Sequence, residues 1–291
     1  MFAKLEKTAR SGRATGPLVQ RHALWTRITH WLWVVCFAFL LMSGLQIFNA
    51  HPNLYWGAES GFSYDNSVLQ IGVTETPTGP RGRTTILGHG FGTTGVLGFS
   101  GPDGQLQARA FPAWATIPSY RDLGTGRVVH FFFAWLLVVT LVLWFLGSVL
   151  NGHLRRDILP GPRDLRDLPR DIADHLRFRF HHVARYGVLQ KLSYAVVLLG
   201  LFPMIILTGL TMSPTMNAAW PWLLDLFGGR QSARTLHFVA ASLMLAFLVV
   251  HLLMVLLAGP VNELRSMITG WYRTDPSETA MKEGRDPCDI R

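Results

Sequence analysis

The chain has 291 residues, of which 49% are hydrophobic and 15% are Asp, Glu, Lys or Arg. Soluble domains usually carry about 25% charged residues, so this composition indicates a membrane protein. The formal net charge of +9 does not indicate nucleic-acid binding, because the basic residues flank apolar runs and so favour a role in membrane orientation. Cys36 lies in an apolar run and Cys288 in a polar tail, and the sequence has no Cys-x-x-Cys-His motif for covalently attached haem.

Four apolar runs follow one another along the chain. They cover residues 30–50, 128–150, 188–211 and 235–258, each at least 20 residues long and almost without charge. At about 1.5 Å per residue, each can cross the roughly 30 Å of hydrocarbon in a bilayer. The first run is too long for the apolar core of a signal peptide. We therefore predict an all-α membrane protein built as a four-transmembrane-helix bundle.

Lysine and arginine counts predict the orientation of these helices. Residues 1–29 are rich in lysine and arginine and residues 151–187 in arginine, whereas the only basic residues among 212–234 are Arg230 and Arg234. Because basic loops stay inside, both termini and the middle loop are expected in the cytoplasm. The expected parts are a cytoplasmic tail at 1–29, a four-helix domain at 30–258 and a second cytoplasmic tail at 259–291.

The external segment at residues 51–126 is long and rich in Gly, Pro and Thr. Its GPDG motif at 101–104, between two short strand-like stretches, predicts short β-hairpin elements. A structureless loop of this length is uncommon, which favours a docking surface over a floppy insertion, although both remain open.

The middle cytoplasmic segment at 151–187 contains a pattern of apolar residues with helical spacing. The residues that share this face are Leu165, Leu168, Ile172 and Leu176. The pattern is typical of an amphipathic helix in the membrane interface, or equally of a basic flank that is helical.

Four histidines lie within or at the ends of the apolar runs. They are His30, His130, His237 and His251. An ionisable residue in a transmembrane helix costs a few kcal/mol and is therefore a functional candidate. His237 and His251 are 14 residues apart, about 21 Å and close to four turns, so they share one helix face at two depths. The orientation then predicts an outer pair, His130 with His237, and an inner pair, His30 with His251.

Two imidazole pairs at two depths are suited to two haems, each with both axial positions filled by histidine. A metal-transport path would add acidic, Cys or Met ligands at the same depth, and the four runs contain no Asp or Glu. Isolated histidines bonded to neighbouring helices are the structural alternative, and His22 is a rival for the inner ligand. Small residues that would let a haem approach the backbone are Gly44, Gly147, Gly200, Gly209, Ala240 and Ala241.

At these residues the chain resembles the cytochrome b subunits of bacterial formate dehydrogenase, nickel–iron hydrogenase and thiosulfate reductase. The matching segments are RHALWTRITHW, SGLQIF, RVVHFFFAW, RYGVLQKLSY, LTGLTMSP and RTLHFVAASLMLAFLVVH. The thiosulfate-reductase-like branch is the most similar, through SGLQIFNAHP and YGVLQKLSY. The resemblance implies two b-type haems with the same histidine pairing, a multi-pass protein of the bacterial inner membrane, and a quinone site near the cytoplasmic haem.

The resemblance also implies residues for the quinone site, namely Tyr186, Gln190 and Lys191. Some formate dehydrogenase relatives have Asn at the position of Gly187, so this chain departs from the family there. The alternative for the three residues is an ordinary helix entrance with a basic anchor.

By resemblance, the expected function is that of an electron-transfer subunit rather than the catalytic subunit of a respiratory complex. It would transfer electrons between membrane quinone and a periplasmic oxidoreductase, expected to contain molybdenum and to be of the sulfite-oxidase or thiosulfate-reductase type. One alternative is a self-sufficient diheme membrane oxidoreductase that acts on quinone and a small external substrate. Another is a haem-free transporter or sensor, which haem content would distinguish.

Overall fold

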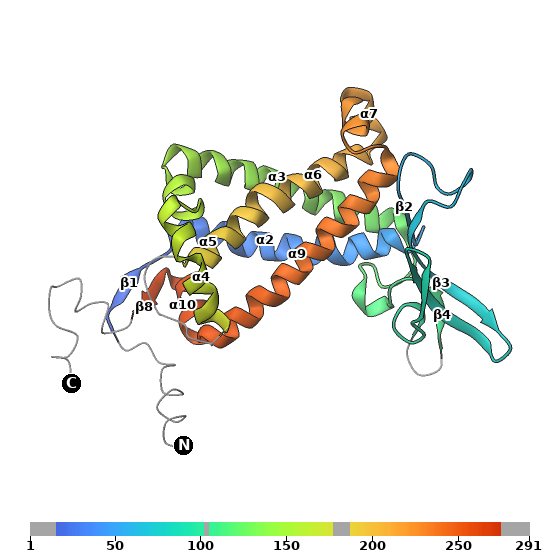
Figure 1. Cartoon of the computed structure of the whole chain (residues 1–291), viewed down its shortest axis with the longest axis horizontal. Helices are drawn as coiled ribbons and strands as arrows, with labels where there is room; N and C mark the ends of the chain where they lie inside the picture. The colour runs from blue at the N-terminus through green and yellow to red at the C-terminus, as the bar shows by residue number, and fades with distance from the viewer. Residues whose placement is uncertain (1–15, 102–104, 177–186, 275–291) are drawn as a thin grey trace, which may run out of the picture. The chain divides into compact units, whose positions relative to one another are not determined.

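The structure, a computed structural model, describes residues 16–101, 105–176 and 187–274. Four helical segments are long and apolar enough to cross a membrane. They are α2 (Leu24–Phe48), α3 (Leu123–Leu150), the segment Val188–Thr211 and α9 (Arg230–Ala258) (Figure 1). Exposed apolar side chains run along them, with Phe132 at 64% and Val249 at 59% exposure. Surfaces of this kind are stable against hydrocarbon and not against water.

The third of these segments is interrupted by a π-helical stretch. It consists of α5 (Val188–Ala195), the π-helix η4 (Val196–Leu201) and α6 (Phe202–Thr211). Pro203 lies in the first turn of α6 and has no backbone N–H to donate. The change in hydrogen-bond register just before Pro203 accommodates the missing donor, as π-bulges and prolines commonly do in helices.

The chain forms two compact units. Unit 1 comprises the described residues within 1–31, 141–200 and 244–291, and unit 2 comprises those within 32–140 and 201–243. Each transmembrane segment contributes to both units, so each unit is built from helix halves together with the segments that connect them.

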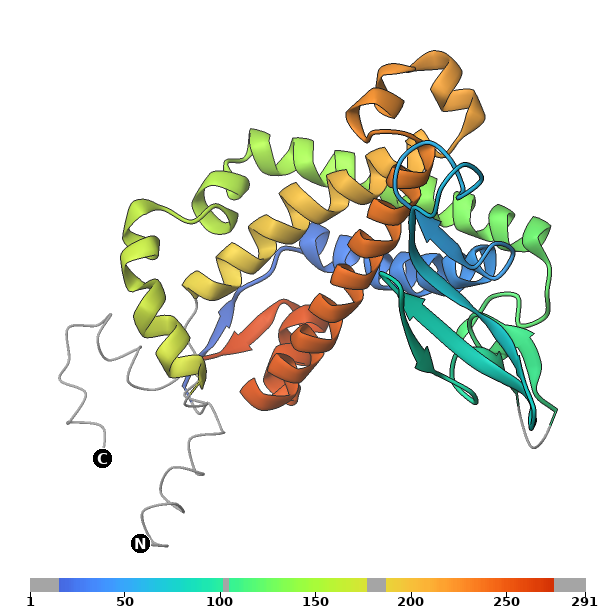
Figure 2. The same cartoon turned by 45° about the vertical axis from the view of Figure 1, so that its right-hand side comes forward.

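Unit 2 contains an antiparallel sheet in the order β2-β3-β4-β5. Figure 2 shows β3 and β4 as two long paired strands. The strands are β2 (Asn53–Tyr55), β3 (Ser67–Thr76), β4 (Gly79–Ile86) and β5 (His89–Gly92). Between β4 and β5, Leu87 and Gly88 both have positive φ (47° and 82°), which matches the twist of a two-residue hairpin turn.

A separate hairpin, β6 (Gly98–Ser100) with β7 (Gln107–Arg109), flanks the GPDG motif as the sequence predicts. Residues 102–104 of that motif lie outside the described residues. The segment at 51–126, predicted to be external, therefore contains the predicted hairpin elements, and in addition a larger sheet that the sequence pattern did not reveal.

This sheet is packed onto helix ends within unit 2. Phe48 at the end of α2 joins Leu54, Ile71 and Ala110 in one buried cluster, and Phe238 of α9 packs against it. Thr235 Oγ1 donates a hydrogen bond to the Tyr55 carbonyl at 2.7 Å. The segment is thus a folded part of the unit rather than a floppy insertion. Two short helices, α7 (Pro214–Ala219) and α8 (Trp222–Leu226), follow α6 in the same unit.

Unit 1 contains the chain before α2, the segment between α3 and α5, and the chain after α9. Strand β1 (Leu18–Gln20) pairs with β8 (Trp271–Arg273), which follows α10 (Pro260–Thr269). The chain just before α2 and the chain just after α10 therefore lie side by side (Figure 1). Such pairing fits an even number of membrane crossings.

The middle segment of unit 1 forms η3 (Leu154–Ile158) and α4 (Pro162–Leu176). The helix predicted from the apolar pattern is therefore present as α4, although the Leu165 and Leu176 side chains lie outside the described residues. Asp171 of α4 accepts a hydrogen bond from the Leu189 amide at 2.8 Å. This carboxylate caps the N-terminus of α5, where a negative charge is favourable.

Candidate functional site

Unit 2 brings His130 of α3 opposite His237 of α9. Their ring centroids are 6.3 Å apart and the rings are tilted by 58°. Both side chains are partly buried. These are the two residues that the predicted orientation assigns to the outer pair.

Unit 1 brings His30 of α2 opposite His251 of α9 in nearly the same geometry. The centroids are 6.5 Å apart and the rings are again tilted by 58°. Phe247, one turn before His251 on α9, stacks on its ring at 5.8 Å. These two residues are the predicted inner pair.

The separation within each pair fits one metal atom between two imidazoles. A first-row metal lies about 2 Å from an imidazole nitrogen, so two rings on opposite sides of one metal have centroids about 6.3 Å apart. Rings joined by a direct N–H···N hydrogen bond would have centroids about 5 Å apart. Within the described ranges no group of three or more His, Cys, Asp or Glu side chains could hold a metal ion. Each site thus offers two imidazoles, which is the axial donor set of a b-type haem.

The outer histidines have equivalent neighbours on two different helices. Ser43 Oγ lies 3.0 Å from His130 Nδ1, and Thr208 Oγ1 lies 3.1 Å from His237 Nδ1. The residue after each hydroxyl is a glycine. A Cβ added to Gly44 or to Gly209 would lie 3.3 Å from Cε1 of the facing histidine.

Sequence reasoning noted the two glycines and missed the two hydroxyl residues. The signal that could have found them is the repeated dipeptide, Ser-Gly at 43–44 and Thr-Gly at 208–209, each followed by leucine near one end of a transmembrane segment.

His22, the rival for the inner ligand, lies before α2 and is 8% exposed. Burial, with the charges of Arg21 and His30 nearby, lowers the pKa of His22 from 6.5 to about 4. The ring that faces His251 is that of His30.

The residues suggested for quinone binding have different environments. Tyr186 lies outside the described residues. Gln190 Nε2 donates a hydrogen bond to the Tyr194 hydroxyl at 2.7 Å. Lys191 forms an ion pair with Asp164 of α4 at 3.0 Å. The ammonium of Lys191 is therefore used, at least in part, to join α5 to α4.

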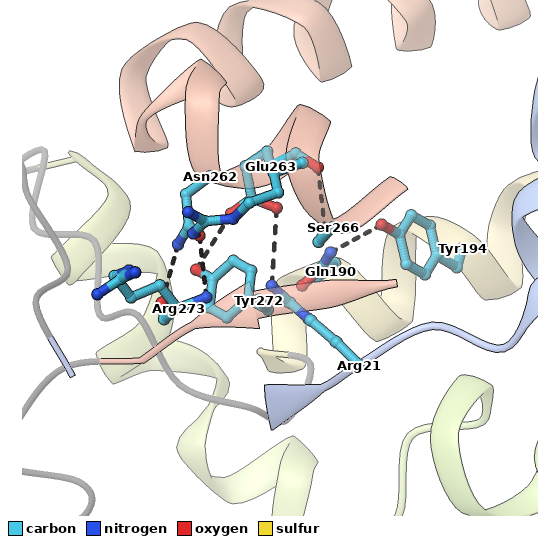
Figure 3. A network of polar contacts seen from close by, with 9 residues as sticks. Arg21, Gln190, Tyr194, Asn262, Glu263, Ser266, Tyr272 and Arg273 are labelled. Carbon is cyan, nitrogen blue, oxygen red and sulfur yellow. Dashed lines mark hydrogen bonds and ion pairs between the residues drawn. The ribbon is translucent and has the colours of Figure 1, made fainter. Parts of the chain in front are cut away.

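A polar network lies around α10 and β8 in the same unit (Figure 3). Tyr272 donates a hydrogen bond to Glu263 at 3.2 Å, and Arg21 lies 3.6 Å from the same carboxylate. The Arg21 guanidinium also stacks over the Tyr272 ring at 4.3 Å. Burial, and then the negative charge of Glu263, raise the pKa of Tyr272. This network links the chain before the first membrane span to the chain after the last one, because Arg21 follows β1 and Tyr272 lies in β8.

Comparison with known proteins identifies the family. The profile of the family described as prokaryotic cytochrome b561 matches residues 21–270. The putative protein-methionine-sulfoxide reductase subunit YedZ1 of Azospira oryzae is 27% identical over 251 residues, which cover 86% of this chain and 96% of that protein. The matched region contains all four transmembrane helices and both histidine pairs. The chain therefore belongs to the prokaryotic cytochrome b561 family, as a multi-pass membrane cytochrome of the b type.

Proposed function

We propose that the protein is a diheme electron-transfer subunit of the bacterial inner membrane, with His30 and His251 as axial ligands of an inner haem and His130 and His237 as those of an outer haem. The observation that carries this proposal is the repeated geometry of the pairs, with centroids 6.3 and 6.5 Å apart and the same tilt. When bound, a haem with two histidine ligands takes up and releases single electrons without an open position for oxygen. The histidines hold the iron and fix its environment.

Quinone would react on the cytoplasmic side, close to the inner pair. Gln190 and Tyr194 form a hydrogen-bonded pair in unit 1, the unit that contains His30 and His251. An amide and a phenol can both donate to a quinone oxygen. Lys191 would join them only after release from Asp164, and Tyr186 completes the proposed set by its place in the sequence.

A periplasmic oxidoreductase would exchange electrons with the outer haem. The similarity to YedZ1, named as a subunit of a putative protein-methionine-sulfoxide reductase, supports such a partner. We propose a molybdenum-containing enzyme of the sulfite-oxidase or thiosulfate-reductase type, with the folded segment at 51–122 as the surface available to it.

The experiment that tests the two haem sites is haem quantification on purified variants. Wild type should hold two b haems per chain, with a visible spectrum that carbon monoxide does not change. His30→Ala and His251→Ala should each remove the inner haem, and His130→Ala and His237→Ala the outer one. His89→Ala, at an exposed position in β5, is the matched control and should retain both. Two haems retained in His30→Ala would contradict the assignment.

A second candidate is a self-sufficient oxidoreductase with a small external substrate. An open depression of about 780 Å³ in unit 2 offers a place for such a substrate. Polar residues in its wall are Asp225, Arg230 and Gln231. Turnover of a small substrate by the isolated chain, lost in Arg230→Gln, would support this candidate. Co-purification of a tightly bound external subunit, with no turnover by the chain alone, supports the electron-transfer subunit.

A further inference from the structure

The outer histidines each contact a hydroxyl group, His130 that of Ser43 on α2 and His237 that of Thr208 on α6. Both Ser43 and Thr208 are fully buried, with 0% exposure, so water does not compete for their hydrogen bonds. Each hydroxyl lies about one hydrogen bond from the Nδ1 of a histidine, at 3.0 and 3.1 Å. The direction of these bonds decides which nitrogen of each ring carries the proton.

The hydroxyl protons are already used within their own helices. Ser43 Oγ lies 2.6 Å from the Phe39 carbonyl, and Thr208 Oγ1 lies 2.6 Å from the Met204 carbonyl. Two oxygens this close repel unless a proton lies between them, and a hydroxyl has a single proton to give. Each hydroxyl can therefore only accept a hydrogen bond from the histidine.

The same unit holds a pair in which this direction is chemically fixed. Trp33 Nε1 donates to Thr140 Oγ1 at 3.0 Å, since an indole nitrogen cannot accept. Thr140 Oγ1 in turn donates to the Leu136 carbonyl at 2.8 Å, one turn earlier. A helix hydroxyl that donates backwards to a carbonyl and accepts an N–H from a facing helix is thus an arrangement this fold already uses.

From this geometry we infer that Ser43 and Thr208 are positioning residues that hold the proton of His130 and His237 on Nδ1. The lone pair of each ring then lies on Nε2, the nitrogen that would ligate the iron. The following glycines, Gly44 and Gly209, leave room for the rings at this position. This inference rests on the proposed diheme function and goes further, because it assigns the tautomer and the donor strength of one ligand pair.

The inner pair is built differently. His30 Nδ1 is buried and has no hydrogen-bond partner among the residues that the structure describes. A hydrogen bond from Nδ1–H to an acceptor raises the basicity of a histidine ligand and stabilises the oxidised metal. The two hydroxyls should therefore lower the reduction potential of the outer haem and leave that of the inner haem unaffected.

The test is a potentiometric titration of the purified holoprotein, followed in the visible spectrum. Ser43→Ala and Thr208→Val each remove one hydroxyl acceptor, and the double variant removes both hydroxyls. The backbone carbonyls of Leu40 and Ile205, which also accept from His130 and His237, remain in all three variants. We expect the midpoint potential of one haem to shift upward, further in the double variant, while the other haem keeps its potential. Ser43→Thr and Thr208→Ser keep a hydroxyl acceptor at each position, so the potential of that haem should stay close to the wild-type value.

Ser242→Ala is the matched control, because Ser242 donates to the Phe238 carbonyl at 2.8 Å in α9 but its exposed side chain faces no histidine in the hydrogen bonds described. The shifted haem must be the one that His130→Ala removes. Unchanged midpoint potentials in a double variant that holds two haems overturn the inference. An equal shift in the potentials of both haems also overturns it, as do potentials of Ser43→Thr and Thr208→Ser that match those of the hydroxyl-free variants. Haem content of wild type, measured on the same samples, tests the proposed function separately: no haem at the outer pair overturns both.

Discussion

At the scale of single residues, the positions of the outer imidazoles depend on two glycines as well as on the two hydroxyl groups that contact them. Gly44 and Gly209 have no Cβ, and His130 and His237 pack into the space that results. A methyl group at either position would lie 3.3 Å from a ring carbon, below the usual contact distance of about 3.5–4.0 Å. A shift of the facing helices by a few tenths of an ångström would therefore move the His130 and His237 rings.

Gly44→Ala should displace the His130 ring and reduce outer haem occupancy, bringing the protein toward one haem per chain. Alanine is the better helix former by about 1 kcal/mol, so a loss of haem would come from crowding and not from a weaker helix. Haem per chain and the two-step redox titration measure the effect. Gly92→Ala, at an exposed position in β5 where an added Cβ would have no neighbour within 4 Å, is the control and should behave as wild type. Full occupancy with an unshifted spectrum in Gly44→Ala would exclude close packing at this ring.

His22 gives the fold a defined pH dependence. The pKa of His22 is lowered from 6.5 to about 4 by burial and by the neighbouring positive charges, so the folded protein keeps the ring neutral where the unfolded chain protonates it. The stability that depends on neutral His22 is complete above about pH 6.5 and is lost as the pH falls toward 4.

His22→Asn should therefore flatten the fall in Tm between pH 7 and pH 5 in detergent, while His89→Asn, at an exposed strand position, keeps the wild-type slope. Equal slopes in all three proteins would show that His22 titrates alike in the folded and unfolded states.

At the scale of elements, the buried guanidinium of Arg109 is a centre of hydrogen bonds in the segment predicted to be external. Arg109 of β7 is 6% exposed and its guanidinium donates to the Ser119 carbonyl at 2.6 Å, to Gln46 Oε1 at 3.2 Å and to Thr116 Oγ1 at 3.0 Å. Gln46 lies near the end of α2 and is 2% exposed. Arg109 therefore joins the hairpin, the chain after it and a transmembrane helix within unit 2.

Arg109→Lys should destabilise the external segment by about 2 kcal/mol, because a single ammonium cannot satisfy the acceptors that a planar fork reaches. Faster cleavage of the segment by a protease added to membranes or detergent-solubilised protein measures this. Arg81→Lys, the same substitution at an exposed position of β4, should not alter the rate. An unchanged rate for Arg109→Lys would mean that the hydrophobic cluster around Phe48 holds the segment by itself.

At the scale of the whole molecule, the pairing of β1 with β8 constrains the topology. The register Leu18↔Arg273, Val19↔Tyr272 and Gln20↔Trp271 requires both flanks to be on one side of the membrane. Four crossings satisfy this requirement, and the basic residues of the flanks favour the cytoplasmic side.

Cysteine accessibility tests that topology in a Cys288→Ser background. Gly92→Cys, at an exposed position in β5, should react with an impermeant maleimide only in right-side-out vesicles. Val261→Cys in α10, where the native side chain is 78% exposed, should react only in inverted vesicles. Labelling of both from one side would contradict four crossings, and exchange of the two patterns would reverse the proposed orientation.

Local sequence patterns were sufficient for several features. The four spans follow from apolar length, which depends on composition alone, and the hairpin around residues 101–104 follows from its turn residues. The sheet β2–β5 was not predicted because its alternation is weak and interrupted by glycine, so cross-strand pairing had to define it. The family resemblance assigned Lys191 to the quinone site. Its ion pair with Asp164, 27 residues away in the sequence, could not be predicted from any local pattern.

The sequence by itself determined the number of candidate membrane spans and the identity of the four histidines in them, and it predicts their order in depth, because hydropathy, charge bias and helical rise are all local quantities. Only the tertiary structure decided that the imidazoles face each other at 6.3 and 6.5 Å, and that Ser43 and Thr208 lie against one pair and not the other. Those distances depend on how separate helices approach one another, which is set by the packing of small and large side chains between them.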